Sequence, residues 1–512
     1  MTKTAWILLS VLALSQISDA YKILVSFPVP GKSHSILGQG VVKHLLNAGH
    51  EVTFITSVVE NTTNPKFHQV DVSDNFNYLP KETFTITKIM DKEVAIHEHS
   101  FIMPMTNGMQ AGTLKNKNVQ KLLNDLDQKF DMVIVEWLFT ELGAGLAAVF
   151  DAPLVWLSSL EPHWMILRLV DEGLNPAYSG DYLAGNIPPF TFQRRVEELW
   201  IQIKTLLFMY TQNDDAQSKI YEDVIAPHIV KRGRNPPPFK EVMYNASLIL
   251  GNSHVSLGVA TRLPQSYKPI AGYHIDEVVK PLPENLQKIM DNAKHGVIYF
   301  SMGSNLRSKD LPDDLKKSLI KMFSELKQTV FWKFEDDFPN LPKNIHVLKW
   351  APQQTILAHP NCVLFITHGG LLSTTETIHY GVPIIGIPVF ADQFINVHRA
   401  VKKGFAKKVD LSETMVDELK NTILEMTSDP KYKQKAKELS FIYHDRPVRP
   451  GAELVHWVEH VIKTGGAPHL RSPALNVPWY HKVYLDLAVV VLGLITVVIV
   501  VLKQLFYLLF AK

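Results

Sequence analysis

A group of polar residues in the C-terminal third of the chain has the types and spacing that hold a phosphorylated, hydroxyl-rich ligand. His368 and Gly370 follow the apolar run 363–367 and open a helical pattern, whose first amides are unpaired and attract an anion. Ser373 adds a hydroxyl one turn later, and Glu376 lies three residues further along the same helical face. A carboxylate accepts hydrogen bonds from two neighbouring hydroxyls at once, so Glu376 suits a vicinal diol such as that of a ribose.

Two more polar residues stand after the next strand of this pattern. The run 383–388 reads as a short strand bounded by prolines, and Asp392 and Gln393 lie in the loop beyond it. In open α/β sheets, ligands bind just beyond the carboxyl ends of the strands, so these side chains should face the same ligand. An anion, a ribose and a second polyol in a row describe a nucleotide-sugar.

The elements that would position these residues alternate between strand and helix, an order that predicts parallel sheets with right-handed crossovers. The first series has strands at 22–27 and 50–56 around a helix at 36–46. The second series has a helix at 313–327 and strands at 296–301, 329–334, 345–349, 363–367 and 383–388. We therefore expect an α/β protein with an N-terminal domain at 21–265, a Pro-rich linker at 266–286 and a C-terminal domain at 287–464.

Both ends of the chain carry apolar segments. A basic start, an apolar run and small residues up to Ala20 predict a secretory signal peptide over 1–20. The last apolar run predicts a transmembrane helix over 485–508, followed by a short tail to the end of the chain at 512. Together they predict a single-pass membrane protein with its bulk in the lumen of the secretory pathway. Asn61 and Asn245 lie in sequons for N-glycosylation, a short pattern that also arises by chance.

The composition excludes several classes of protein. The chain has 52 Lys and Arg against 50 Asp and Glu, a net charge of +2, which gives no electrostatic footprint for nucleic acid. The single cysteine, Cys362, excludes an intrachain disulfide and a cysteine metal cluster, and its apolar neighbours predict a buried thiol. Asp125 and Asp127 have the spacing of a metal-binding pair but belong to a polar helical stretch, so we expect a solvent-facing surface and no metal.

The segment 196–210 reads as an amphipathic helix rich in Leu, Ile and Trp. Packing of its apolar face inside the domain is the favoured interpretation, and contact with a membrane or with substrate is the alternative. The surrounding block 161–245 has weak periodicity, which is typical of segments that decorate a binding face.

The stretch from Phe365 to Gln393 resembles, position for position, the signature of the UDP-glycosyltransferases, a membrane-anchored family that conjugates small lipophilic molecules. The likeness extends over nearly the whole chain. HGGLLSTTE and SMGSNLRS are similar to the insect branch rather than to the vertebrate glucuronosyl branch. The resemblance implies a GT-B fold, in which two Rossmann-like domains face each other across a cleft, with a C-terminal transmembrane helix.

The resemblance also implies a role for each polar residue of the C-terminal domain. Trp350 of WAPQ would stack on the uracil, and Gln353 would hydrogen-bond to it. Glu376 would hold the ribose, and Asp392 with Gln393 would hold the hydroxyls of the sugar. The diphosphate would lie against Gly370 and be held by Ser304, His368 and Ser373. Leu372 departs from the pattern, since many relatives carry Asn there.

On the acceptor side, the family places its general base where His34 stands, after the first strand and in the loop before the first helix. An imidazole with a pKa of about 6.5 accepts a proton from a hydroxyl at neutral pH. The family orients this histidine with an aspartate at the end of a later strand, and the matching residue here is Glu136. Glu136 either accepts the second ring N–H of His34 or pairs elsewhere and leaves His34 to work alone.

The resemblance therefore implies a metal-independent hexosyltransferase of the endoplasmic reticulum membrane, with a role in detoxification. It would move a sugar, glucose by likeness to the insect branch, from a UDP-sugar to a hydroxyl of a small lipophilic acceptor, with inversion. UDP-glucose would be a co-substrate, and no cofactor is expected. The first alternative is a membrane-anchored protein that binds UDP-sugar or lipophile without turnover, and the second is an epimerase or hydrolase on the same frame. The sequence leaves open whether the protein is a homo-oligomer.

Overall fold

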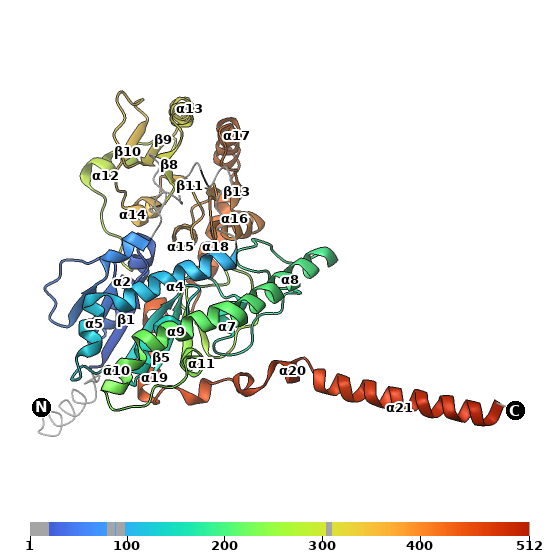
Figure 1. Ribbon diagram of the computed structural model, residues 1–512. Helices are drawn as coiled ribbons and strands as arrows, with labels where there is room; N and C mark the ends of the chain where they lie inside the picture. Colours follow the sequence, from blue (N-terminus) through green and yellow to red (C-terminus); the bar gives the residue numbers. More distant parts are fainter. Residues whose placement is uncertain (1–19, 79–87, 89–97, 304–309, 511–512) are drawn as a thin grey trace, which may run out of the picture.

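The computed structural model describes residues 20–78, 88, 98–303 and 310–510, which form two α/β units (Figure 1). Among these residues, the N-terminal sheet has seven parallel strands in the order β3-β2-β1-β4-β5-β6-β7. The strands are β1 (Lys22–Phe27), β2 (Glu51–Thr56), β3 (Phe67–Asp71), β4 (Met132–Trp137), β5 (Leu154–Ser158), β6 (Ala246–Gly251) and β7 (Tyr267–Pro269). Strand β4 is buried along its whole length, as expected of a central strand in a sheet covered on both faces.

The helices of the N-terminal unit cover both faces of this sheet and bury two apolar clusters against it. They are α2 (Lys32–Asn47), α4 (His99–Lys115), α5 (Lys117–Asn124), α6 (Gly145–Phe150), α7 (Trp164–Leu167), α8 (Phe192–Phe208), α9 (Asp214–Val224), α10 (Ala226–Lys231) and α11 (Phe239–Met243). A turn of π-helix at Met209–Asn213 joins α8 to α9.

The C-terminal unit has a second parallel sheet, with six strands among the described residues in the order β10-β9-β8-β11-β12-β13. The strands are β8 (Val297–Ser301), β9 (Thr329–Lys333), β10 (Ile345–Leu348), β11 (Cys362–Thr367), β12 (Ile384–Gly386) and β13 (Ala406–Lys408). The helices are α12 (Glu284–Asp291), α13 (Asp313–Ser324), α14 (Gln353–Ala358), α15 (Leu371–Tyr380), α16 (Gln393–Lys402), α17 (Met415–Ser428) and α18 (Lys431–His444). The two sheets confirm the α/β architecture expected from the sequence.

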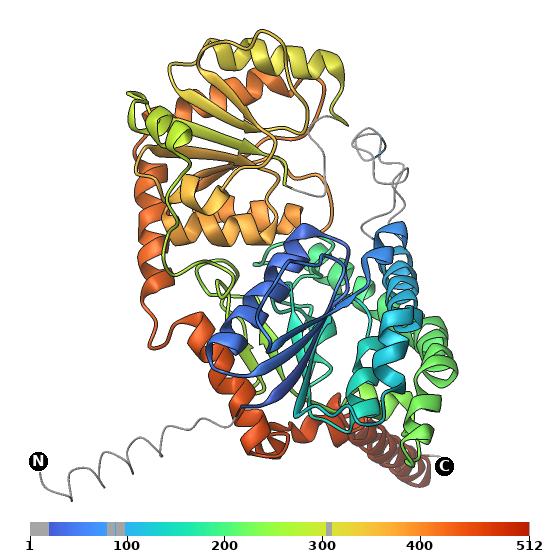
Figure 2. The same ribbon diagram turned by 90° about the vertical axis from the view of Figure 1, so that its left-hand side faces the viewer.

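The boundaries between the two units differ from the expected ones at two places. Residues 267–269 form β7, so the N-terminal sheet extends into the segment 266–286 that was expected to be a linker. Helix α19 (Pro450–Lys463), expected in the C-terminal domain 287–464, returns to the N-terminal unit and packs on α2 (Figure 2). The reason is its apolar face: Leu454 and Val458 are fully buried in the same cluster as the inner residues of α2.

The C-terminal end of the chain is apolar and exposed. After the short α20 (Trp479–Lys482), α21 (Leu485–Phe510) runs for 26 residues and is long and apolar enough to cross a membrane. It projects away from the body (Figure 1), and its side chains are not buried. This helix is compatible with the membrane anchor expected over 485–508. The expected signal peptide, 1–20, lies outside the described residues except for Ala20.

Helix α8 and the π-turn after it cover the segment 196–210 that was read as an amphipathic helix, and most of the apolar side chains of this segment face outward. Trp200 is 62% exposed and Leu207 is 57% exposed, while the fully buried residues of the helix are Glu198 and Thr205. The favoured interpretation holds only for the C-terminal end of the segment, where Leu206, Phe208 and Met209 pack against the core of the N-terminal unit.

Candidate active site

The proposed base and its partner meet at the carboxyl end of the N-terminal sheet. Strands β1 and β4 are neighbours, so the helix that follows β1 begins beside the end of β4. His34 lies in the first turn of α2 rather than in a loop, because the helix already begins at Lys32. Its Nδ1 is hydrogen-bonded to Oε1 of Glu136 in β4. The carboxylate of Glu136 is inaccessible to solvent, whereas the imidazole of His34 keeps 18% of its surface exposed.

The surroundings of His34 favour its protonated form. Burial acts against a positive charge, but the negative charge and hydrogen bond of Glu136, helped by the more distant Asp392, raise the pKa of His34 above its ordinary value of 6.5. Asp392 belongs to the C-terminal unit, so its effect on His34 shows that the two side chains lie near each other although they come from different units. When the imidazole is neutral, the bond to Glu136 keeps the proton on Nδ1 and leaves Nε2 free to accept one.

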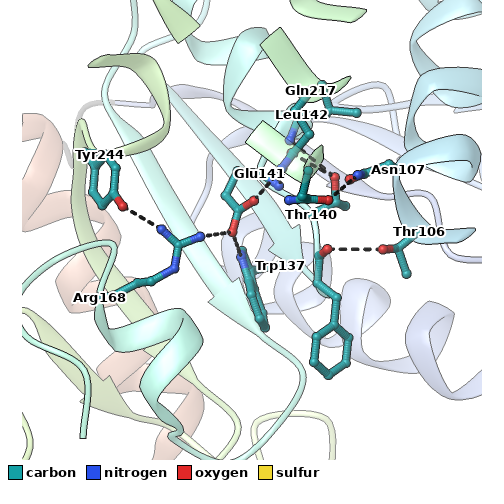
Figure 3. A network of polar contacts seen from close by, with 11 residues as sticks. Thr106, Asn107, Trp137, Thr140, Glu141, Leu142, Arg168, Gln217 and Tyr244 are labelled. Atoms are coloured by element: carbon teal, nitrogen blue, oxygen red, sulfur yellow. Dashed lines mark hydrogen bonds and ion pairs between the residues drawn. The ribbon is translucent and has the colours of Figure 1, made fainter. Parts of the chain in front are cut away.

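A buried polar network holds the end of β4 in place from the other face of the sheet (Figure 3). Trp137 follows Glu136 and points to the opposite side of the strand, where its Nε1 donates to Glu141 at 3.2 Å. The Glu141 carboxylate also accepts from Arg168 Nη2 at 3.0 Å and from Gln217 Nε2 at 2.9 Å. The pattern of the sequence gave no sign of this network, because Arg168 and Gln217 are distant in sequence from Trp137 and Glu141.

The glycine pair before α15 forms the turn expected from the sequence. Gly369 has φ +82°, and a Cβ there would lie 2.3 Å from Val397, so only glycine fits. Gly370 is the N-cap of α15, and a Cβ on it would lie 2.7 Å from Nε2 of His368. The two glycines thus let the turn close and let the His368 ring lie over the start of the helix.

His368 is a neutral side chain in a positively charged setting. Burial, with a smaller contribution from the nearby ammonium of Lys333, lowers the pKa of His368 to about 4. Lys333 ends β9, and its Nζ donates to the carbonyl of Gly303 at 2.7 Å and to the carboxylate of Glu335 at 2.8 Å. A neutral imidazole, a lysine and the positive end of a helix therefore converge where an anion was expected. Sequence reasoning missed Lys333, because a single lysine at the end of a strand carries no signal.

Three of the expected donor-binding residues form one hydrogen-bonded group. Nε2 of Gln353 donates to Oγ of Ser373 at 3.1 Å and to Oε2 of Glu376 at 2.5 Å. Gln354, which sequence reasoning also missed, donates to Oε1 of Glu376 at 3.1 Å. Burial raises the pKa of Glu376 to about 7, and the two glutamine hydrogen bonds oppose the rise.

Trp350 stands at the edge of the cleft. The ring is 55% exposed, and Nζ of Lys32 lies 3.8 Å from its centroid. Lys32 comes from the first turn of α2, two residues before His34, so this cation–π contact joins the two units next to the candidate base. An aromatic ring with open surface in this position is able to stack on a planar base.

Asp392 and Gln393 differ in what they offer a ligand. The carboxylate of Asp392 accepts from Nδ2 of Asn396 at 2.7 Å, and burial raises its pKa. Gln393 is buried, and its Oε1 accepts the backbone N–H groups of Val389 at 2.8 Å and of Phe390 at 3.1 Å. Its amide oxygen therefore holds the loop that follows β12.

Three further expectations concern Ser304, Cys362 and a metal site. Ser304 lies outside the described residues. Cys362 is fully buried, as expected, and burial raises the pKa of its thiol to about 12. Among the residues that the structure describes, no group of three or more His, Cys, Asp or Glu side chains is arranged to hold a metal ion.

Comparison with known proteins shows to which family the chain belongs. A family model of UDP-glucoronosyl and UDP-glucosyl transferases matches residues 22–512. The chain belongs to this family. It is 30% identical over 506 residues to UDP-glycosyltransferase UGT5 of Dactylopius coccus, covering 96% of this chain and 93% of the relative. It is 29% identical over 525 residues to UDP-glucuronosyltransferase 2B15 of Rattus norvegicus, covering 97% and 95%. The protein is thus a transferase of glucosyl or glucuronosyl groups.

Solved structures confirm the fold. The calicheamicin glycosyltransferase CalG4 matches with a TM-score of 0.56 at 15% identity, over 87% of this chain and 100% of the other. The glycosyltransferase VinC, solved in complex with dTDP, also matches with a TM-score of 0.56, at 16% identity and with the same coverage. Both neighbours confirm the GT-B arrangement of two Rossmann-like units that the sequence predicted.

Proposed function

We propose that this UDP-glycosyltransferase transfers glucose from UDP-glucose to a hydroxyl group of a small lipophilic acceptor, with inversion at the anomeric carbon and with His34 as the general base. The observation that carries the proposal is the hydrogen bond between His34 and the buried carboxylate of Glu136. A glutamate at this position keeps the orienting role that the family gives to an aspartate.

The reaction would proceed by a single displacement. Nε2 of His34 takes the proton of the acceptor hydroxyl as its oxygen attacks C1 of the glucose from the face opposite UDP. The new C1–O bond forms while the bond between C1 and the diphosphate breaks, and the electron pair of that bond leaves with UDP. The Glu136 carboxylate stabilises the imidazolium that results.

The leaving diphosphate gathers negative charge, and this chain offers positive charge in the right region. The start of α15 presents unpaired backbone amides, and Lys333 lies close to His368 at that start. These groups stabilise the departing UDP without a metal ion. Glu376, released from Gln353, accepts the ribose hydroxyls, and Asp392 accepts from hydroxyls of the glucose.

Glucose is favoured by relatives rather than by any single contact. UDP-glucosyltransferase 2 of Dactylopius coccus is 31% identical over 476 residues, covering 92% of this chain. The sequence at both ends supports a location in the endoplasmic reticulum membrane, with α21 as the single span and the body in the lumen. Glycosylation at Asn61, which is exposed, would fit that side of the membrane.

The test uses the full chain in microsomes with UDP-glucose or UDP-glucuronate and a panel of phenolic acceptors. Release of UDP together with a β-glucoside from the α-linked donor supports the proposal, and chelator should leave the rate unchanged. Turnover with UDP-glucuronate alone would overturn the choice of glucose. Binding of UDP-glucose without release of UDP would favour the alternative of a binding protein, and donor consumption without acceptor would favour a hydrolase.

A further inference from the structure

Helix α8 buries two polar side chains and exposes most of its apolar ones, while Leu206 and Phe208 near its end pack against the core. Oε2 of the buried Glu198 accepts the backbone N–H of Asp181 at 2.6 Å, and Oε1 accepts from Nδ2 of Asn186 at 2.6 Å. Thr205, two turns later on the same face, is also buried. These contacts fix the rotation of the helix about its axis and therefore determine which side chains face outward.

The outward side of α8 and of the π-turn after it is a continuous apolar stripe. Its residues recur every three or four positions and are between 40% and 75% exposed: Phe192, Val196, Leu199, Trp200, Ile203, Leu207 and Tyr210. This period follows one face of a helix. Contiguous exposed apolar surface of this kind marks an interaction site, because single exposed apolar residues are common but ordered stripes are not.

Basic side chains border the stripe. Arg195 and Lys204 are exposed on the two flanks of the stripe, and Arg195 lies over the ring of Phe192 with its guanidinium carbon 5.9 Å from the centroid. Arg194 lies on the opposite face of the helix and pairs with Glu197 at 2.6 Å. Helices that lie in a membrane interface combine an apolar face that carries Trp, Phe and Leu with Arg and Lys beside it. The stripe therefore has the composition that suits lipid rather than another protein core.

The position of the candidate membrane span identifies the occupant. Figure 1 shows α8 and α21 extending from the same side of the body. Exposed aromatic residues, Trp479, Tyr480 and Tyr484, stand immediately before α21, where a span meets the lipid headgroups. The segment 471–484 is able to reach at most about 50 Å even when fully extended. A membrane crossed by α21 thus lies within that distance of the body, and Figure 1 shows α8 on the side toward which α21 projects.

We infer that α8 is a second membrane contact, whose apolar stripe lies in the interfacial layer of the bilayer that α21 crosses. The ligand is the lipid surface itself: acyl chains against Trp200 and its neighbours, and phosphate headgroups against Arg195 and Lys204. In this arrangement the body is seated on the membrane by two elements far apart in the sequence, rather than swinging on a single flexible tether.

The single cysteine allows a direct test on the full chain. Cys362 is buried and its thiol is hard to ionise, so cysteines introduced as Trp200→Cys or Leu207→Cys are labelled selectively with an environment-sensitive fluorophore. Lys317→Cys on α13 of the other unit is the control, since its side chain is 76% exposed and lies away from α8 (Figure 1). Each variant is placed in lipid nanodiscs that hold one copy of the chain.

At positions 200 and 207 we expect blue-shifted emission and at least threefold weaker quenching by iodide than at position 317. Lipids with a quencher attached to the upper acyl chain should quench the first two labels and not the third. Equal iodide quenching at all three positions, in variants that keep the melting temperature of the wild type, would overturn the inference. Protection that appears only when several copies share a disc would assign the stripe to a second copy of the chain and equally overturn it.

Discussion

Nδ1 of His34 at the start of α2 is hydrogen-bonded to Oε1 of Glu136 near the end of β4, although 101 residues separate the two in sequence. The parallel pairing of β1 with β4 brings the two elements together. The sequence left open whether Glu136 pairs with His34 or with another group. In the structure it pairs with His34.

Removal of the Glu136 carboxylate should slow the enzyme without preventing donor binding. In Glu136→Gln the imidazole loses the charge that stabilises its protonated form, so we expect kcat to fall about 10²–10⁴-fold, as for loss of general-base assistance. The KM for UDP-glucose should change little, because the proposed donor site lies on the other unit. Initial rates of UDP release measure both constants, and activity of Glu136→Ala within twofold of wild type would exclude the dyad.

The pH dependence of the rate should follow the raised pKa of His34. A base acts only when it is neutral, so kcat/KM should rise with pH through a pKa above 6.5 in the wild type. Glu136 raises that pKa, and Glu136→Gln should therefore move the acidic limb to lower pH. The measurement is kcat/KM against pH between about 5 and 9. An acidic limb at the same pH in both proteins would show that another group controls the rate.

Local patterns in the sequence predicted the sheets because apolar runs and turn residues mark strands directly. They missed the first turn of α2, since Gly31 supplies no side-chain cap and the apolar spacing starts only at Ile36. The expectation that His34 lies in a loop failed for that reason. Periodicity identified α8 but not its direction, because a helix has the same apolar face whether that face meets a protein core or a membrane.

The candidate site was predictable only where a motif is continuous along the chain. The glycine turn, Ser373 and Glu376 lie within one stretch, and the structure places them as expected. The cation–π contact between Lys32 and Trp350 joins distant parts of the chain, so no local sequence pattern predicts it. Family resemblance supplied the link between His34 and Glu136, which spacing alone leaves open.

The buried carboxylate of Glu376 should lower the stability of the ligand-free protein at a pH where the carboxylate is ionised. Burial raises its pKa from 4.5 to about 7, so the folded state holds a proton that the unfolded chain releases. This contribution to stability is complete below pH 4.5 and is lost as pH rises through 7. Glu376→Gln should therefore raise the melting temperature of the ligand-free protein at pH 8 and change it little at pH 4.5.

The same substitution should weaken the donor complex, because an amide accepts the two ribose hydroxyls less well than a carboxylate. We expect an increase in KM for UDP-glucose of about tenfold, the effect of a loss of about 1.4 kcal/mol. Ser412→Ala, on the exposed surface of the same unit, is a control that should change neither property. A stability curve for Glu376→Gln parallel to that of the wild type would show that Glu376 stays ionised in the folded protein.

The network behind β4 should contribute to stability through paired charge. Arg168→Met leaves the buried Glu141 without its cation, and we expect a loss of about 3–5 kcal/mol in the free energy of unfolding of the N-terminal unit. Arg168→Met with Glu141→Gln removes both charges and should recover part of that loss. Denaturant unfolding of the detergent-solubilised chain, followed by tryptophan fluorescence, measures the difference. A double variant less stable than Arg168→Met alone would show that the hydrogen bonds of Glu141 to Trp137 and Gln217, rather than the charge pair, hold the end of β4.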